Sequence, residues 1–151
     1  MRLLVTFIWM FIASFLVQFF LMGPIMTYQI SHVHYTLGKT YLSVLMGLFM
    51  VFIETVMHDH HYGVFSAKYY IVTLLLIALV VYLYRKQKYI RDKQYLEEMI
   101  EHHSMALLTS ERILEKTNQY EVAKIAKNII QTQKDEIREM EALLTHENMR
   151  S

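Results

Sequence analysis

The stretch 74-LLLIALVVYLYRKQKYIRDKQYLEEM-99 decides the fold, because an apolar run gives way to a charged one at Arg85. From Arg85 onward the sequence has twelve basic and twelve acidic residues. Before that point the only formally charged residues are Arg2, Lys39, Glu54, Asp59 and Lys68. Charged side chains are costly to bury, so the first part suits a low-dielectric medium and the second suits water. We expect a transmembrane region at residues 1–84 and an aqueous domain at residues 85–151.

Three apolar runs, at about residues 3–22, 41–57 and 67–84, are long enough to predict transmembrane helices. A cleaved signal peptide is the alternative for the first run. Its apolar stretch, however, exceeds the usual length of about 7 to 15 residues, and no small-residue cleavage site follows. Gly23-Pro24 is expected to end this helix. The sequence therefore predicts an integral membrane protein whose partner is the lipid bilayer.

The composition excludes several classes of protein. The net charge of +1 and the lack of a long basic run argue against nucleic acid as a partner. The chain has no cysteine, which excludes disulfides, thiolate metal sites and a cysteine nucleophile. One proline and four glycines leave few turns, and the charged part shows no strand-type alternation. These features predict an all-α protein.

The charged part predicts two amphipathic helices, at about residues 87–116 and 119–146. A connection of two or three residues would make them an antiparallel hairpin. Two helices cannot enclose their own apolar seam, so we expect a homodimer to complete a four-helix bundle.

A group of soft and borderline metal donors lies in this hairpin. Met99, His102 and His103 stand at i, i+3 and i+4, on one face of a helix. Folding the hairpin pairs residues whose numbers sum to about 235, which sets the histidines opposite Gln133 and Met99 opposite Glu136. The candidate metal ligands are Met99, His102, His103, Glu136 and Met140, with Gln133 as a residue that orients a ligand. Thioether and imidazole donors suit copper, Cu(I) especially. The alternative is that the paired histidines are solvated surface residues.

A second group lies in the membrane region. Glu54, His58 and His61 would share one side of the second apolar helix if that helix continued for another turn. They could then form a second metal cluster. Alternatively, Glu54 lies near the headgroups and residues 58–61 form a solvated turn. The sequence leaves open whether the histidines outside the hairpin bind metal: His32, His34, His58, His60 and His61.

Two segments of the hairpin resemble the family known as domain of unknown function 305, a group of ferritin-like helical bundles. These segments are 99-MIEHHSMALLTSER-112 and 126-AKNIIQTQKDEIREM-140. Tyr28, His32-Val33, Tyr41 and Leu45-Met46-Gly47 resemble a membrane-anchored branch of the family. The resemblance implies copper association at the paired histidines. Many relatives have proline just before those histidines, where this chain has Glu101.

The resemblance also implies a bacterial-type inner membrane and an extracytoplasmic carboxy-terminal domain. The charge pattern argues for the opposite orientation, because five basic residues closely follow the third apolar run, against only Arg2 at the amino end. These are Arg85, Lys86, Lys88, Arg91 and Lys93.

The function expected from the sequence is copper binding and buffering in envelope copper homeostasis, without catalysis. A metal-free membrane scaffold that oligomerises is the first alternative. A ferritin-like di-iron oxidase is the second, but it would require a Glu-x-x-His step, and here Met99 and Ile100 precede the histidines by three residues.

Overall fold

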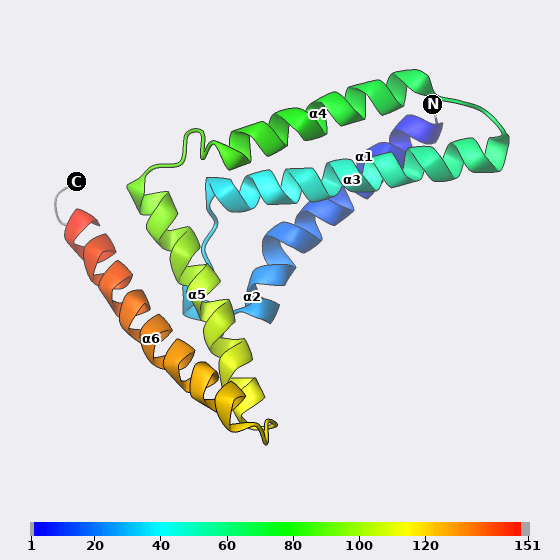
Figure 1. Ribbon diagram of the computed structural model, residues 1–151. Helices are drawn as coiled ribbons and strands as arrows, with labels where there is room; N and C mark the ends of the chain where they lie inside the picture. The colour runs from blue at the N-terminus through cyan, green and yellow to red at the C-terminus, as the bar shows by residue number, and fades with distance from the viewer. Residues whose placement is uncertain (1, 149–151) are drawn as a thin grey trace. The chain divides into compact units, whose positions relative to one another are not determined.

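The computed structural model describes the backbone of residues 2–148, which is all-α with no strand (Figure 1). The helices, in chain order, are α1 (Arg2–Leu16), a π-helical turn (Val17–Leu21), α2 (Met22–Met26), a 3-10 turn (Ile30–His32), α3 (Leu37–Tyr62), α4 (Ala67–Arg85), α5 (Asp92–Leu114) and α6 (Tyr120–Asn148). The chain forms two compact units. Unit 1 comprises Met1–Leu21 and Leu37–Tyr89, and unit 2 comprises Met22–Thr36 and Ile90–Ser151.

The division at residues 84 and 85 expected from the sequence is close to the observed boundary after Tyr89. It is wrong for one segment. Residues 22–36 were expected to belong to the membrane region, but they pack with the hairpin in unit 2.

The helices at the amino-terminal end are longer than expected. Gly23-Pro24 does not end the first helix, which continues to Met26. A π-helical turn at Val17–Leu21 comes directly before α2. Such a wide turn relieves the clash that a proline ring makes with the preceding turn of a helix. The second helix runs from Leu37 to Tyr62 rather than from 41 to 57, so the interpretation of residues 58–61 as a turn is wrong.

Helix α4 confirms the expected third apolar helix, and α6 lies within two residues of its expected bounds. Helix α5 begins at Asp92 rather than at 87. The difference arises at Gln87 and Tyr89, whose φ angles of 48° and 63° lie in the left-handed region and interrupt the helix. Since neither residue is glycine, the sequence gives no signal for this break.

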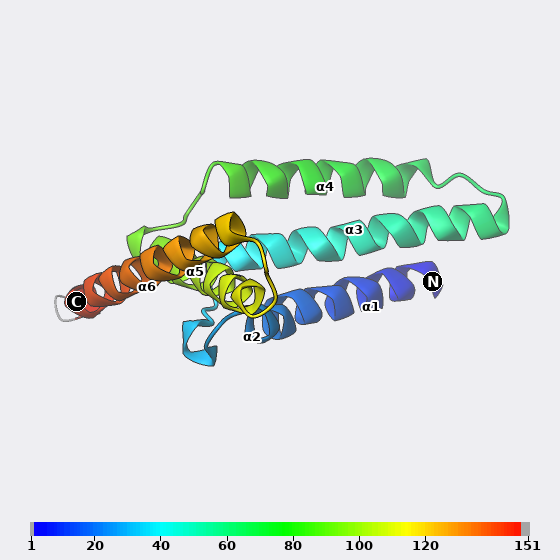
Figure 2. The same ribbon diagram turned by 60° about the horizontal axis from the view of Figure 1, so that its bottom comes forward.

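Unit 1 is a layer of three helices in which α3 contacts both α1 and α4 (Figure 2). At Gly47 the helices α1 and α3 approach closely, because a Cβ atom there would lie 2.7 Å from the ring of Phe11. The side chains buried along α3 and α4 include Ser43, Thr55 and Thr73. Small residues of this kind allow close helix packing in a membrane.

The outward faces of unit 1 are apolar. Trp9, Phe65 and Leu75 are 67%, 80% and 66% exposed, and many other large apolar side chains are exposed along the same helices. Three helices are long and apolar enough to cross a bilayer: Leu3–Met26, Leu37–Tyr62 and Ala67–Arg85. An apolar exterior of this extent suits contact with lipid.

Unit 2 is built on the hairpin of α5 and α6, joined by residues 115–119 (Figure 1). Its apolar core is formed by Ile100 and Leu107 from α5 and by Ala126 and Ile137 from α6, each at most 4% exposed. Helix α2 and the 3-10 turn also contact α5. Helix α5 is therefore packed on two faces, one against α6 and the other against α2 and the 3-10 turn.

Candidate metal centre

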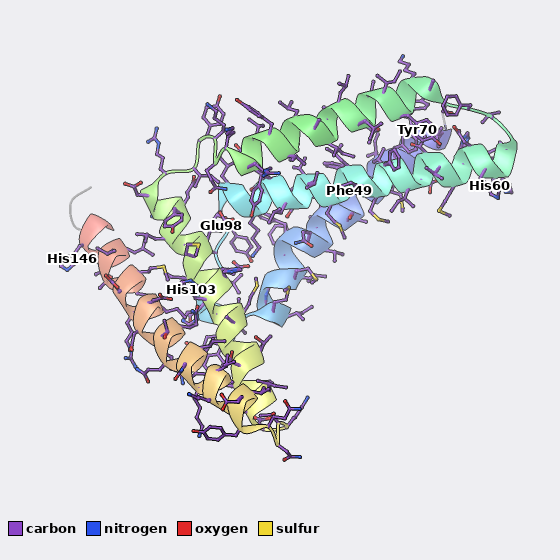
Figure 3. All side chains as sticks on the ribbon, in the orientation of Figure 1. Phe49, His60, Tyr70, Glu98, His103 and His146 are labelled. Atoms are coloured by element: carbon purple, nitrogen blue, oxygen red, sulfur yellow. The ribbon has the colours of Figure 1, made fainter. Side chains whose placement is uncertain are left out.

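The candidate centre is organised around His103, which projects from α5 towards α6 (Figure 3). Its Nδ1 atom lies 3.5 Å from Oε2 of Glu136 on α6. The side chain of His103 is only 17% exposed, and Nδ1 is buried with no hydrogen-bond partner. The contact with Glu136 is thus too long or too bent to satisfy the nitrogen.

The pairing of His103 with Glu136 fixes the local register of the hairpin, in which facing residue numbers sum to 239 rather than the expected 235. The connection has five residues instead of two or three. Side chains in both helices also point towards the amino end of their own helix. A residue of α5 therefore meets a residue of α6 that lies further from the loop, which raises the sum of their numbers. By this register Met99, one turn before His103, lies opposite Met140, one turn after Glu136. Both methionines are half-buried.

The other two predicted residues occupy different surroundings. His102 is exposed, and its ring centroid lies 6.2 Å from that of His103 at an interplanar angle of 49°. Gln133 donates from Nε2 to Oε2 of Glu136 at 3.3 Å, while its own carbonyl oxygen is buried without a partner. Gln133 therefore contacts a candidate ligand, as an orienting residue would, rather than the histidines themselves.

Burial shifts the pKa values of two side chains on α5. Burial lowers the pKa of His103 below its usual value, although the nearby Glu136 carboxylate acts in the opposite direction. Burial also raises the pKa of Glu98, and the neighbouring Glu101 carboxylate adds to this effect. A neutral His103 has a lone pair available for a metal ion at neutral pH.

The separation of His103 and Glu136 is compatible with two donors to one metal ion. Two donors bound to one ion at about 2.1 Å with a tetrahedral angle lie about 3.4 Å apart, close to the separation of Nδ1 of His103 and Oε2 of Glu136. An unpartnered buried imidazole nitrogen, a carboxylate and two thioethers are a mixed N, O and S donor set. Within residues 2–148 no three or more His, Asp or Glu side chains are grouped to hold an ion by themselves, so sulfur donors or water would have to complete the coordination.

Sequence reasoning missed a second polar cluster on the other face of α5. Ser104 is fully buried, accepts a hydrogen bond from the backbone N–H of Tyr28 at 2.8 Å, and lies 3.0 Å from Nδ1 of His32. The opposite nitrogen of His32 lies 3.6 Å from Oε1 of Glu141 on α6. The imidazole of His32 is therefore held between α5 and α6.

A neighbouring carboxylate supports the same segment. Glu101 is buried and accepts a hydrogen bond from the backbone N–H of His34 at 2.9 Å. The Glu101 side chain therefore ties the backbone at His34 to α5. The one signal in the sequence was a group of polar residues in that segment, of which Thr27, His32 and Thr36 are buried.

The second predicted group lies in unit 1. Because α3 continues to Tyr62, Glu54, His58 and His61 share one side of that helix and line a common pocket of about 350 Å³. None of its lining residues belongs to the hairpin.

The fold and site define a class of protein: an all-α chain in which three helices able to span a membrane are joined to a helical hairpin with a His, Met and carboxylate seam. Residues 92–151 match the family model described as "Domain of unknown function (DUF305)". Uncharacterized protein L153 of Acanthamoeba polyphaga mimivirus is 32% identical over 142 residues, which cover 94% of this chain and 93% of that protein.

This likeness extends through both the apolar region and the hairpin, so the chain belongs to the same family as L153 and carries a DUF305 domain. No solved structure matches the chain at a significant level.

Proposed function

We propose that this chain is a membrane-anchored copper-binding protein, which buffers copper or hands it on and catalyses no reaction. The ligands are the imidazole of His103, the thioethers of Met99 and Met140, and the carboxylate of Glu136. The observation that carries the proposal is the buried Nδ1 atom of His103, which has no hydrogen-bond partner and lies 3.5 Å from that carboxylate.

The donor set favours exchangeable copper over other ions. Thioether sulfur is a soft ligand that suits Cu(I), while imidazole and carboxylate also accept Cu(II). Hard ions such as Mg²⁺ and Ca²⁺ prefer sites made of oxygen alone. A single carboxylate beside two sulfurs also makes this site unlike a di-iron oxidase centre, which takes inward carboxylates from several helices.

A homodimer that completes a ferritin-like four-helix bundle is part of the proposal. An apolar groove of about 450 Å³ lies along α5 and α6 towards their connection, lined by Thr109, Ser110, Ile113, Val122, Ile125, Ala126 and Ile129. His102 lies on the same face of α5 as Thr109 and Ile113, which follow it by seven and eleven residues. A second copy that covers the groove would also shield His102 from solvent.

Copper titration of the full-length protein in detergent tests the site, with a chromophoric Cu(I) chelator as competitor. The variant His103→Ala with Met140→Leu should weaken Cu(I) affinity about tenfold or more, because it removes two ligands. His146→Ala is the matched control, since His146 is an exposed histidine near the end of α6 (Figure 3). Unchanged affinity in the double variant would remove the proposed site.

We further propose that the hairpin is extracytoplasmic, in a bacterial-type inner membrane. A single cysteine introduced by Thr145→Cys, at an exposed position of α6, should react with an impermeant maleimide added to intact cells. Protection from that reagent, together with labelling by a permeant one, would place the hairpin in the cytoplasm, as the charge pattern predicts.

The alternative function is a metal-free scaffold that assembles through the apolar groove. The exposed side chains of Ile113 and Ile125 beside the groove favour such association. A scaffold should keep its oligomeric state after His102→Leu with His103→Leu, and cells carrying this variant should tolerate copper as the parent does. Greater copper sensitivity in those cells would favour the copper-binding function.

A further inference from the structure

The carboxy-terminal end of α4 carries three basic side chains within four residues. Arg85 is the last residue of the helix, and Lys86 and Lys88 follow it directly. All three side chains are exposed. Among the side chains that the structure describes, no carboxylate forms an ion pair with any of them. Three uncompensated positive charges, here called the basic cluster, therefore stand at the end of an apolar helix.

The charges of unit 1 are distributed unevenly between its two ends. Helices α3 and α4 lie side by side and antiparallel, so the start of α3 is beside the end of α4 (Figures 1 and 2). The first turn of α3 adds a further basic residue, Lys39. In the described part of this unit, the acidic residues Glu54 and Asp59 lie towards the other end of α3. The end at which α4 stops therefore carries positive charge alone.

The backbone of the basic cluster is fixed by hydrogen bonds. The N–H of Lys88 donates to the carbonyl of Leu83 at 3.0 Å. The N–H of Gln87 donates to the carbonyl of Tyr84, also at 3.0 Å, which completes the Schellman pattern of a helix end. The left-handed Gln87 suits this pattern. The hydroxyl of Tyr41 on α3 also donates to the carbonyl of Lys88 at 2.9 Å, so the chain leaves α4 along a defined path.

These bonds also show that the lysines are not needed to cap the helix. Basic side chains near the end of a helix often hydrogen-bond its last carbonyls. Here the carbonyls of Tyr82, Leu83 and Tyr84 already accept backbone N–H groups from residues 86–88. The ammonium groups of Lys86 and Lys88 are thus left to interact with a ligand from outside the chain.

We propose that Arg85, Lys86 and Lys88 bind the phosphate headgroup of an anionic phospholipid where α4 leaves the bilayer. Basic residues directly after a spanning helix are attracted to anionic headgroups. The planar guanidinium of Arg85 can bind two phosphate oxygens at once, and the lysines supply point charges. Such binding requires the membrane anchoring proposed above but no copper.

The surface beside the basic cluster suits the rest of a phospholipid. Leu79, Tyr82 and Lys86 follow one another at i, i+3 and i+7, so they form one stripe along α4. Leu79 and Tyr82 are both exposed on this stripe, as is Tyr89 just beyond the cluster. Tyrosine is enriched at the boundary between hydrocarbon and headgroups, and leucine suits the acyl chains. An apolar stripe that leads to a basic end favours a lipid over a soluble anion.

Lipid titration of the full-length protein in detergent, read by native mass spectrometry, tests the proposal. Phosphatidylglycerol and phosphatidylcholine with identical acyl chains are compared. The parent should bind phosphatidylglycerol about tenfold or more tightly. The variant Arg85→Gln with Lys86→Gln and Lys88→Gln should bring the two affinities within about twofold. Glycerol 3-phosphate should not displace the bound lipid, and its displacement of the lipid would identify a site for soluble anions and overturn the proposal.

Two matched controls separate this location from a general effect of charge. Lys116→Gln with Lys124→Gln and Lys127→Gln removes the same number of exposed positive charges at the loop end of the hairpin. Lys68→Gln is the partner of Lys88→Gln, because these exposed lysines lie at opposite ends of α4. Both controls should keep the preference of the parent. An equal loss in either control would overturn the proposal, and so would a preference that survives in the cluster variant.

Incorporation into phosphatidylcholine nanodiscs separates failure of this site from failure of the membrane anchor. The parent and the cluster variant should both enter such nanodiscs, because the apolar helices suffice for insertion. A parent that does not enter would refute the anchoring, whereas entry without a lipid preference would refute the headgroup site alone. His103→Ala should keep the lipid preference, since copper takes no part in it. Helical content, measured for every variant, identifies any that misfold.

Discussion

Replacement of Ser104 by alanine should release residues 27–36 from the hairpin. The Ser104 hydroxyl is fully buried, accepts the N–H of Tyr28 at 2.8 Å and lies 3.0 Å from Nδ1 of His32. Alanine leaves both groups without this partner in a site that water cannot readily enter. A buried polar group that loses its hydrogen bond costs about 1–3 kcal/mol. Because the Tyr28 amide is only partly buried, we expect a total loss of about 2–4 kcal/mol in the local stability of the segment.

Amide hydrogen exchange of the full-length protein, read by mass spectrometry, measures this loss directly. Since each 1.4 kcal/mol is a factor of ten, exchange in residues 27–36 should accelerate by about 30- to 1000-fold. Ser110→Ala is the matched control, because Ser110 is also buried on α5 but lines the apolar groove. The reasoning is refuted if Ser104→Ala accelerates exchange in this segment no more than Ser110→Ala does.

Three further predictions concern packing, pH and metal. Gly47→Val should destabilise the contact of α1 with α3 by about 1–3 kcal/mol in thermal unfolding, because its side chain would collide with Phe11; a stability equal to the parent would contradict the close approach. Burial lowers the pKa of His32, against the opposing effect of Glu141, while His34 adds to the lowering. As pH falls below 6.5, the unfolded chain therefore binds more protons at His32 than the folded chain does. Residues 27–36 should accordingly lose exchange protection as pH falls below that value. The variant His32→Gln should flatten this pH dependence. Added Cu(I) should increase exchange protection along α5 and α6 in the parent but not in His103→Ala.

The sequence predicted the elements whose patterns are local. Apolar length alone located three helices able to span a membrane, and the apolar seam located α5 and α6. Two of the errors lie where backbone geometry departs from residue preference. The left-handed Gln87 and Tyr89 and the helical Pro24 occupy conformations that their residue types disfavour.

The candidate site was predictable only in part, because helical spacing is a local pattern whereas the register of the hairpin is not. Met99, His103, Glu136 and Met140 recur at helical spacing, so their shared seam follows from the pattern, whereas the register required the observed contact of His103 with Glu136. The polar cluster around Ser104 joins residues 72 and 76 positions apart, through a segment without periodicity. No local pattern encodes such a contact.

The two faces of α5 bring the candidate metal ligands and the segment of residues 22–36 to one helix. His103 and Ser104 are adjacent, yet the first contacts Glu136 and the second holds the segment that includes His32. On α6, Glu136 contacts His103 and Glu141 lies 3.6 Å from His32. An ion bound between α5 and α6 would fix the separation of the same two helices that hold the imidazole of His32. If metal binding stabilises residues 27–36 against α5 and α6, the linkage is reciprocal, and stabilising that segment strengthens metal binding by the same factor.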